Sequence, residues 1–192
     1  DVTQVSQISP LYGKLAAVVT ATNDPNNYIL LDAIRNHISY IDVTRWTTRF
    51  KEAIIRISGK KITQPIIFSS AWMAGTAALF TKKVSEQFSI IDTIDIDILF
   101  SLRDKAGLNS IEYVDQLGTP YDVFNGGNIR TVKPMTEPKH VDFESGFSTN
   151  TYRLDTPDQL TLPMFSSATS VSARIAYDDK YSVHFLSFMV RS

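Results

Sequence analysis

The chain has 192 residues, of which 43% are hydrophobic and 20% charged, and its formal net charge at pH 7 is −1. This balance is typical of a globular protein with one good core, and the length is short for two domains. The near-zero charge excludes a whole-molecule attraction to nucleic acid or anionic membrane, and the lack of cysteine excludes disulfides and thiol chemistry. Because the first residue is Asp1, we expect trimming or proteolytic release from a longer precursor.

The first regular pattern covers residues 24–41. Asp24 followed by Pro25 fits an N-cap and a first helical position. The apolar residues that recur at three- and four-residue spacing are Leu31, Ile34, Ile38 and Ile41. We predict a helix of two to three turns whose tail, 38–43, becomes a strand. Residues 1–23 are expected to form a short extended arm.

The next two segments are predicted as strands. Residues 46–58 are rich in β-branched and aromatic side chains and stop at a turn-like Ser-Gly-Lys sequence. Residues 69–80, SSAWMAGTAALF, contain strong helix formers. A helix of ten residues with glycine at its centre would be marginal, because glycine costs roughly 1 kcal/mol there. We interpret the small residues after Trp72 as a strand that a neighbouring element approaches closely.

Residues 88–102, FSIIDTIDIDILFSL, show an alternating pattern. The even positions are apolar except for Asp92, and the odd positions include the polar residues Ser89, Thr93, Asp95, Asp97 and Ser101. A period of two over fifteen residues predicts a strand with one buried and one solvated face. Asp92 falls on the apolar face, so we expect it at the entrance of the strand or paired with a basic residue.

The remaining segments are short and separated by turn signals. The sequence Asn125-Gly126-Gly127 between two of them predicts a hairpin, and 181–190, apolar on both faces, is expected to be a central strand. The predicted strands are 111–114, 121–124, 128–132, 140–143, 151–154, 160–162, 170–177 and 181–190. Such spacing predicts an all-β fold, an eight-stranded antiparallel jelly-roll sandwich with one or two short helices. We expect it to form one domain over residues 1–192.

Few residues suggest chemistry. Asp95 and Asp97 lie roughly 6.5–7 Å apart on one strand face and could share Ca²⁺ or Mg²⁺, but a solvated face is the favoured interpretation. His37, His140 and His184 have no metal-ligand spacing. The sequence contains no nucleophile elbow, no phosphate loop and no dinucleotide fingerprint. We therefore predict no catalytic, cofactor-binding or metal residues and no enzymatic activity.

Two surface patterns leave room for binding. The residues that come closest to a stripe that could follow phosphates are Trp46, Arg49, Phe50 and Lys51, although a solvated face is favoured. The tyrosines at 113, 121, 152 and 177 would serve a jelly-roll module that binds carbohydrate or another ligand, and a core would use them equally. This ligand-binding module remains the alternative function.

The segment Ala71-Trp72-Met73-Ala74-Gly75-Thr76 resembles the Ala-Trp-x-x-Gly-Thr sequence of small coat proteins of icosahedral plant picorna-like viruses, the secovirus family, in particular its cheravirus-like members. The resemblance implies a viral capsid protein, cut from a polyprotein. Its partners would be other capsid protein chains in an icosahedral shell, and genomic RNA held by weak, non-specific contact, with no membrane. Its location would be the virion, and the host cytoplasm during assembly.

Overall fold

The computed structural model of the 192-residue chain describes residues 9–22, 24–68, 75–104 and 116–191. The chain divides into two compact units, Asp1–Thr76 and Ala77–Ser192, which are described separately. Within the described ranges no helix has the length and apolar character that a membrane span requires. That residues 1–192 act as one domain stays a prediction.

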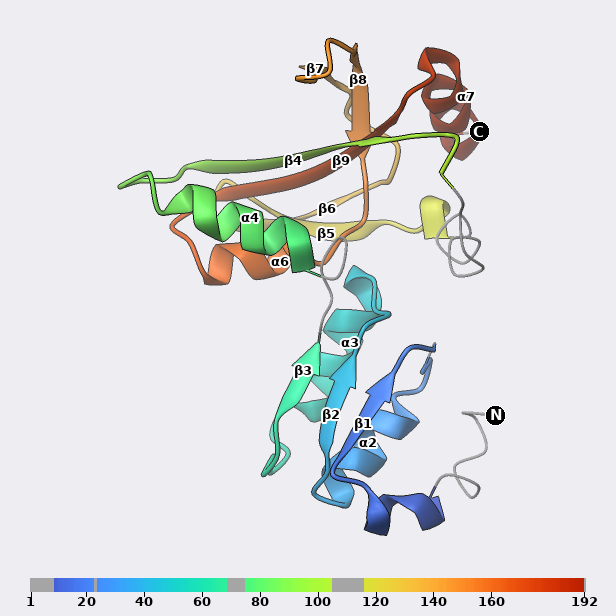
Figure 1. The fold of residues 1–192 in the computed structure, drawn as a ribbon, viewed down its shortest axis with the longest axis vertical. Coiled ribbons are helices and arrows are strands. Elements are labelled where there is room, and N and C mark those ends of the chain that lie inside the picture. Colours follow the sequence, from blue (N-terminus) through green and yellow to red (C-terminus); the bar gives the residue numbers. More distant parts are fainter. Residues whose placement is uncertain (1–8, 23, 69–74, 105–115, 192) are drawn as a thin grey trace. The chain divides into compact units, whose positions relative to one another are not determined.

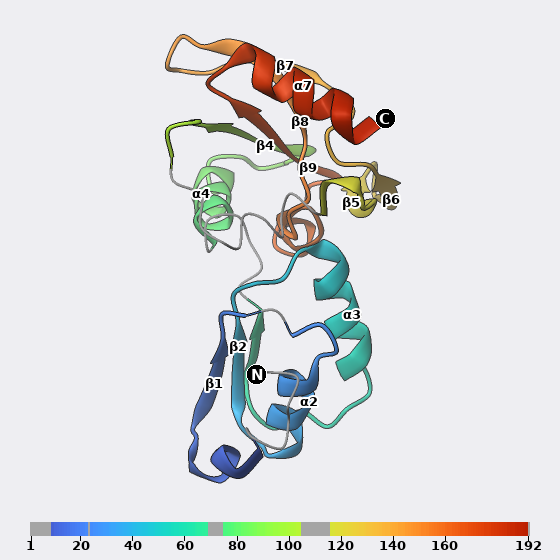
Figure 2. The same cartoon turned by 90° about the vertical axis from the view of Figure 1, so that its right-hand side faces the viewer.

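The first unit is a parallel three-stranded sheet with two helices (Figure 1). After a 3-10 helix, η1 (Ser9–Lys14), its elements are β1 (Ala17–Thr20), α2 (Tyr28–Arg35), β2 (Ser39–Asp42), α3 (Thr47–Ile57) and β3 (Ile66–Phe68). The strand order is β1-β2-β3, and both pairs are parallel. Because both crossovers run in the same direction with the usual right hand, both helices lie on one face of the sheet (Figure 2).

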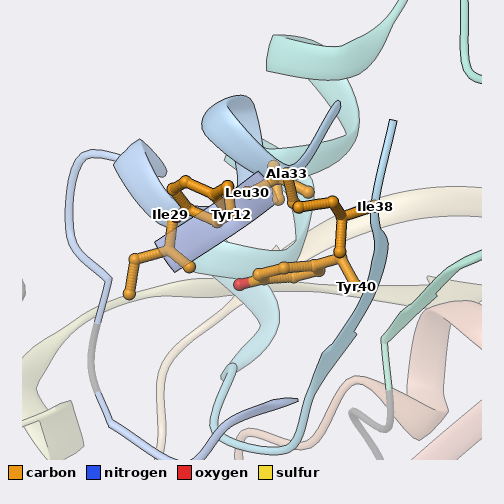
Figure 3. Close-up of a cluster of buried hydrophobic side chains, with 7 residues drawn as sticks. Tyr12, Ile29, Leu30, Ala33, Ile38 and Tyr40 are labelled. Atoms are coloured by element: carbon orange, nitrogen blue, oxygen red, sulfur yellow. The ribbon is translucent and has the colours of Figure 1, made fainter. Parts of the chain in front are cut away.

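The core of this unit lies between the sheet and its helices. Figure 3 shows side chains from η1, α2 and β2 meeting there. Its buried members are Tyr12, Ile29, Leu30, Ala33, Ile38, Tyr40 and Ala53. The predicted helix and its change into strand are confirmed by α2 and β2. Residues 17–20 of the expected arm form the edge strand β1.

The second unit is built on a mixed four-stranded sheet with the order β4-β9-β8-β7. Its strands are β4 (Thr93–Phe100), β5 (Tyr121–Asn125), β6 (Asn128–Val132), β7 (Lys139–Asp142), β8 (Ser148–Arg153) and β9 (Ser170–Tyr177), of which β5 and β6 form a separate hairpin. Its helices are α4 (Thr76–Ser85), α6 (Asp158–Thr161), α7 (Lys180–Arg191) and the 3-10 turns η3 (Gln116–Gly118) and η4 (Leu162–Met164). The pair β4–β9 is parallel, and the pairs β9–β8 and β8–β7 are antiparallel.

The alternation seen in residues 88–102 divides this sheet into two faces. Ile94 and Ile96 turn toward a core formed with Leu162, Ala168 and Val171. The side chains of the odd positions, Asp95 and Asp97 among them, lie on the other face. Five strand predictions are confirmed in type: 128–132 and 170–177 with the bounds predicted, and 88–102, 121–124 and 140–143 with shifted ends. The sixth, 151–154, corresponds to β8, which begins three residues earlier.

The all-β jelly-roll prediction is wrong, because the protein is a mixed α/β structure with parallel strand pairs. Residues 47–57 form helix α3, not a strand. Its inward residues Phe50, Ala53 and Ile57 recur at three- and four-residue spacing, and burial of that stripe outweighs the β preference of the isoleucines.

Three more strand predictions fail for related reasons. Residues 76–80 open helix α4, with Gly75 at φ 91° just before it rather than at its centre. Residues 181–190 lie in α7, and of these ten side chains only those of Val183 and Ser187 are buried, so the apolar residues of this segment do not mark a central strand. Residues 160–162 belong to α6 and η4. The predictions for 69–74 and 111–114 lie outside the described residues.

Candidate functional site

The strongest polar cluster of the first unit lies where its parallel strands end. Strands β1 and β2 end at Thr20 and Asp42, on the same edge of the sheet. In open sheets with parallel strands, ligands bind at this carboxyl edge, because the loops that follow the strands gather there. The loops after Thr20 and Asp42 are therefore the candidate ligand-binding segments.

Arg45 is the centre of the cluster. Its Nε donates to Asp42 Oδ2 at 2.6 Å, its Nη1 to Asn27 Oδ1 at 2.5 Å, and its Nη2 to the Tyr40 hydroxyl at 3.1 Å. The side chains of Arg45, Asp42 and Asp24 are at most 5% exposed. Burial raises the pKa of Tyr40 well above its usual value, so its hydroxyl stays protonated and donates to Asp42 at 2.7 Å.

Asp24 ties the loop after β1 to this cluster. Its carboxylate accepts the backbone N–H groups of residues 28, 29 and 30 and lies 4.0 Å from Arg45 Nη2. Burial raises the pKa of Asp24, and the N–H groups and Arg45 oppose that shift. Asp24 thus supplies the predicted helix cap, although the N-cap position itself is Asn27. The N-terminus of α2 is already occupied by this carboxylate and offers no phosphate site.

The edge itself presents uncharged groups. Val43 is 45% exposed, and Thr22 and Thr44 flank it. Thr44 is held in place by its backbone N–H, which donates to Asp42 Oδ1 at 2.9 Å. Trp46 opens α3, with the guanidinium of Arg49 stacked 5.5 Å from its ring centroid. The buried cluster therefore fixes the loops, and the accessible part, called the carboxyl edge, consists of Thr22, Val43, Thr44 and Trp46.

The second unit carries a charged network on the polar face of its sheet. Lys139 Nζ donates to Asp95 at 2.9 Å and to Asp97 at 3.2 Å. Ser172 and Arg174 also donate to Asp95, and Thr151 donates to Asp97 at 2.8 Å. Partial burial alone would raise the pKa of Asp95, but the Ser172 and Lys139 hydrogen bonds lower it overall. Burial would lower the pKa of Lys139, yet the two carboxylates raise it.

A second anion continues the network. Glu137 accepts from Arg153 at 2.8 Å and from Arg130 at 2.7 Å. Partial burial opposes these bonds, but together they lower the pKa of Glu137. A carboxyl group whose pKa is lowered stays ionised near neutral pH, and an ammonium group whose pKa is raised stays protonated. The network is therefore suited to holding charge in place rather than to proton transfer.

Replacing Lys139 with methionine tests this network. The pKa of Asp95 is expected to rise toward or above its ordinary 3.8, because its nearest ammonium is lost. Since the pKa of Asp95 is lowered in the folded protein, its stabilising contribution is present above pH 3.8 and is lost as the pH falls through the folded value. A carbon-13 NMR titration of the carboxyl groups measures the change. Lys133→Met, at an exposed position, should leave Asp95 unchanged; an equal rise in both variants would contradict the pairing.

The prediction that Asp95 and Asp97 bind no metal stays a prediction. In the structure both carboxylates accept hydrogen bonds from Lys139. The described residues hold no group of three or more side chains that could together bind a metal ion. Asp92 lies at the entrance of β4, as expected. His184 has a hydrogen-bond partner, the Tyr152 hydroxyl at 2.7 Å, but lies on a helix. Tyr121 and Tyr152 are buried and form no carbohydrate platform.

The parallel βαβαβ arrangement of the first unit corresponds to one half of a Rossmann fold, and with the mixed sheet of the second unit it defines an α/β protein with a Rossmann-like part. No family description and no curated protein matches the sequence. Among solved structures the chain is similar to apo histidine-tagged saccharopine dehydrogenase (L-Glu forming) from Saccharomyces cerevisiae, with a TM-score of 0.61 and 14% identity. The match covers 91% of this chain and 43% of that one, so this chain spans less than half of its length.

This likeness of fold overturns the coat-protein predictions. The described residues form a mixed α/β fold and not a jelly roll, so the secovirus coat-protein prediction that rested on the sequence of residues 71–76 is wrong, as are the capsid function and the virus-related descriptions that followed from it. The prediction that the chain is not an enzyme is contradicted as well, because the solved structure whose fold it shares is a dehydrogenase. The predicted partners and virion location rested on the same resemblance and have no independent support.

Proposed function

We propose that this chain forms part of a nucleotide-dependent oxidoreductase. The observation that carries the proposal is the carboxyl edge of the first unit, where the buried Arg45 cluster fixes two loops at the position at which Rossmann-like sheets bind ligands. The dehydrogenase-type fold supports it. In this proposal a nicotinamide dinucleotide is the ligand of that edge.

The residues present suit one part of such a dinucleotide. Thr22, Val43 and Thr44 offer hydroxyl and apolar contacts to ribose and nicotinamide. They do not suit the pyrophosphate, because Asp24 already takes the N–H groups at the start of α2 and a carboxylate repels phosphate. The edge would therefore hold the uncharged part of the ligand. When bound, the nicotinamide supplies hydride transfer.

A matched pair of substitutions tests the proposal. Val43→Glu places a negative charge on the carboxyl edge, and Ile62→Glu places the same charge in the loop before β3, at the opposite edge of the same sheet. The two side chains are similarly exposed, at 45% and 42%. Val43→Glu is expected to raise the dissociation constant for NADH or NADPH at least tenfold, because a charged carboxylate replaces the apolar contact to the uncharged part of the ligand and must lose its hydration when that part binds. Ile62→Glu should leave it unchanged.

Titration of the full chain into the reduced nucleotide, followed by the nucleotide's own fluorescence polarisation, measures both constants. Circular dichroism of each variant confirms that it is folded. The proposal is wrong if neither nucleotide binds the unmodified chain, or if both substitutions weaken binding equally.

A further inference from the structure

A groove of about 530 Å³ runs between α4 and β4, in a part of the second unit that the proposed nucleotide site does not use. In both views of the fold α4 lies beside β4 (Figure 1, Figure 2). One wall is the continuous stretch 90–97, and the other is a stripe of α4 and the turn after it that includes Phe80, Val84 and Phe88. The groove therefore has a strand wall and a helix wall.

The strand wall shows that the groove follows the margin of the sheet. Successive side chains of a strand point to opposite faces, so a groove on one face would meet every second residue. Here neighbours such as Asp95 and Ile96 both line it. Strand β4 pairs with β9 on one side, and within the described residues no strand pairs with its other side. The backbone N–H and C=O groups on that side are available to an additional strand.

The helix wall is apolar and open. Phe80 and Val84 are four residues apart and share one face of α4, and Phe88 follows in the segment after the helix; all three line the groove. They are 67%, 50% and 61% exposed. A row of large exposed apolar side chains beside the edge strand of a sheet is typical of an interaction surface. Together the two walls match grooves in which an extended peptide adds a strand to a sheet while its side chains enter an apolar furrow.

We propose that this groove binds an extended peptide segment that pairs with the free edge of β4 and alternates apolar with basic side chains. The apolar side chains would face Phe80, Val84 and Phe88. The basic ones would lie on the opposite face, next to Asp95, which is 35% exposed despite its contact with Lys139. Asp92, exposed at the entrance of the strand, adds negative charge to the groove.

Charge also argues against a second copy of this chain as the occupant. If two β4 strands paired antiparallel about Ile96, Asp95 of each copy would lie opposite Asp97 of the other. Like charges directly opposite each other destabilise a strand pair. A segment with lysine or arginine at those positions reverses the sign of the interaction.

The test uses a fluorescein-labelled seven-residue peptide in which lysine and valine alternate, titrated with the full chain and followed by polarisation. Only every second amide of an added strand donates to its neighbour. Methylating the amide nitrogens of one alternate set should therefore weaken binding more than tenfold, whereas methylating the other set should change it less than threefold. A peptide with glutamate in place of lysine should bind at least tenfold more weakly.

Two variants of α4 complete the test. Val84→Glu places a charge inside the groove and should weaken binding at least tenfold. Leu79→Glu, on the same helix but outside the groove and 70% exposed, should not. The proposal is overturned if the peptide does not bind, if a shuffled peptide of the same composition binds equally well, or if both methylated sets behave alike. It is also overturned if the chain dimerises through this groove or if hexylammonium binds there and the peptide does not.

Discussion

Replacing Arg45 with methionine is expected to destabilise the first unit by about 3–5 kcal/mol, because it leaves two buried carboxylates without their cation. Asp42 and Asp24 each have side chains only 1% exposed, so water cannot take over the role of the guanidinium. The substitution also removes the hydrogen bonds that Arg45 donates to Asn27 Oδ1 and to the Tyr40 hydroxyl. The loops of the carboxyl edge should loosen with it, since both are anchored through these residues.

Urea unfolding, combined with hydrogen exchange of the α2 amides, measures the loss. The matched control is Arg35→Met, which removes an arginine that pairs with Asp32 at 2.7 Å but is 71% exposed. That change should cost less than about 1 kcal/mol, as surface ion pairs do. The deficit of Arg45→Met should shrink as the pH falls toward 3.8, because protonation removes the unpaired charge of Asp24. A deficit as small as that of Arg35→Met would show that the cluster is not stabilised by Arg45.

Elements whose pattern is local and unambiguous were predictable. The alternation around Asp95 admits only a strand, and α2 combines an apolar stripe with a capping carboxylate. Helix α3 was not predictable from propensity, since its isoleucines favour strands, and only the spacing of Phe50, Ala53 and Ile57 marks the buried stripe. Helix α7 was missed because it has many more apolar residues than it buries. Neither a helical nor a strand period therefore stands out in its sequence.

The candidate sites also differ in how far a local sequence pattern could have predicted them. Asp42 and Arg45 are three residues apart, and an acidic and a basic residue flanking a predicted strand end could have marked this cluster. Lys139 and Asp97 are 42 residues apart, and they meet only because β7, β8, β9 and β4 lie side by side. No local pattern predicts that pairing. The parallel pairing of β4 with β9, which sets the order of those strands, was not predicted. The predicted strands are separated by short segments, and short connections suggested antiparallel neighbours.

Gln159 is expected to be the most sensitive position of the second unit. Its side chain is fully buried and bonds three backbone groups: Nε2 donates to Leu154 O at 2.9 Å and Thr156 O at 3.3 Å, and Oε1 accepts Ala173 N–H at 3.0 Å. It thereby links the turn before α6 to the middle of β9. Gln159→Leu keeps a similar volume but leaves Leu154 O and the Ala173 N–H without this partner, each at about 1–3 kcal/mol, whereas Thr156 O still accepts the backbone N–H of residue 159 at 3.2 Å. We expect a total loss of about 2–5 kcal/mol.

The same substitution at Gln87 provides the control, because that side chain is exposed beyond the end of α4 and should change stability by less than about 0.5 kcal/mol. Thermal and urea unfolding followed by circular dichroism measure both variants. Hydrogen exchange adds a local readout: the Ala173 amide should lose its protection in Gln159→Leu before neighbouring β9 amides do, since its acceptor is the deleted Oε1. If Ala173 stays as protected as in the unmodified chain, the side chain does not hold the turn against β9, and the loss has another origin.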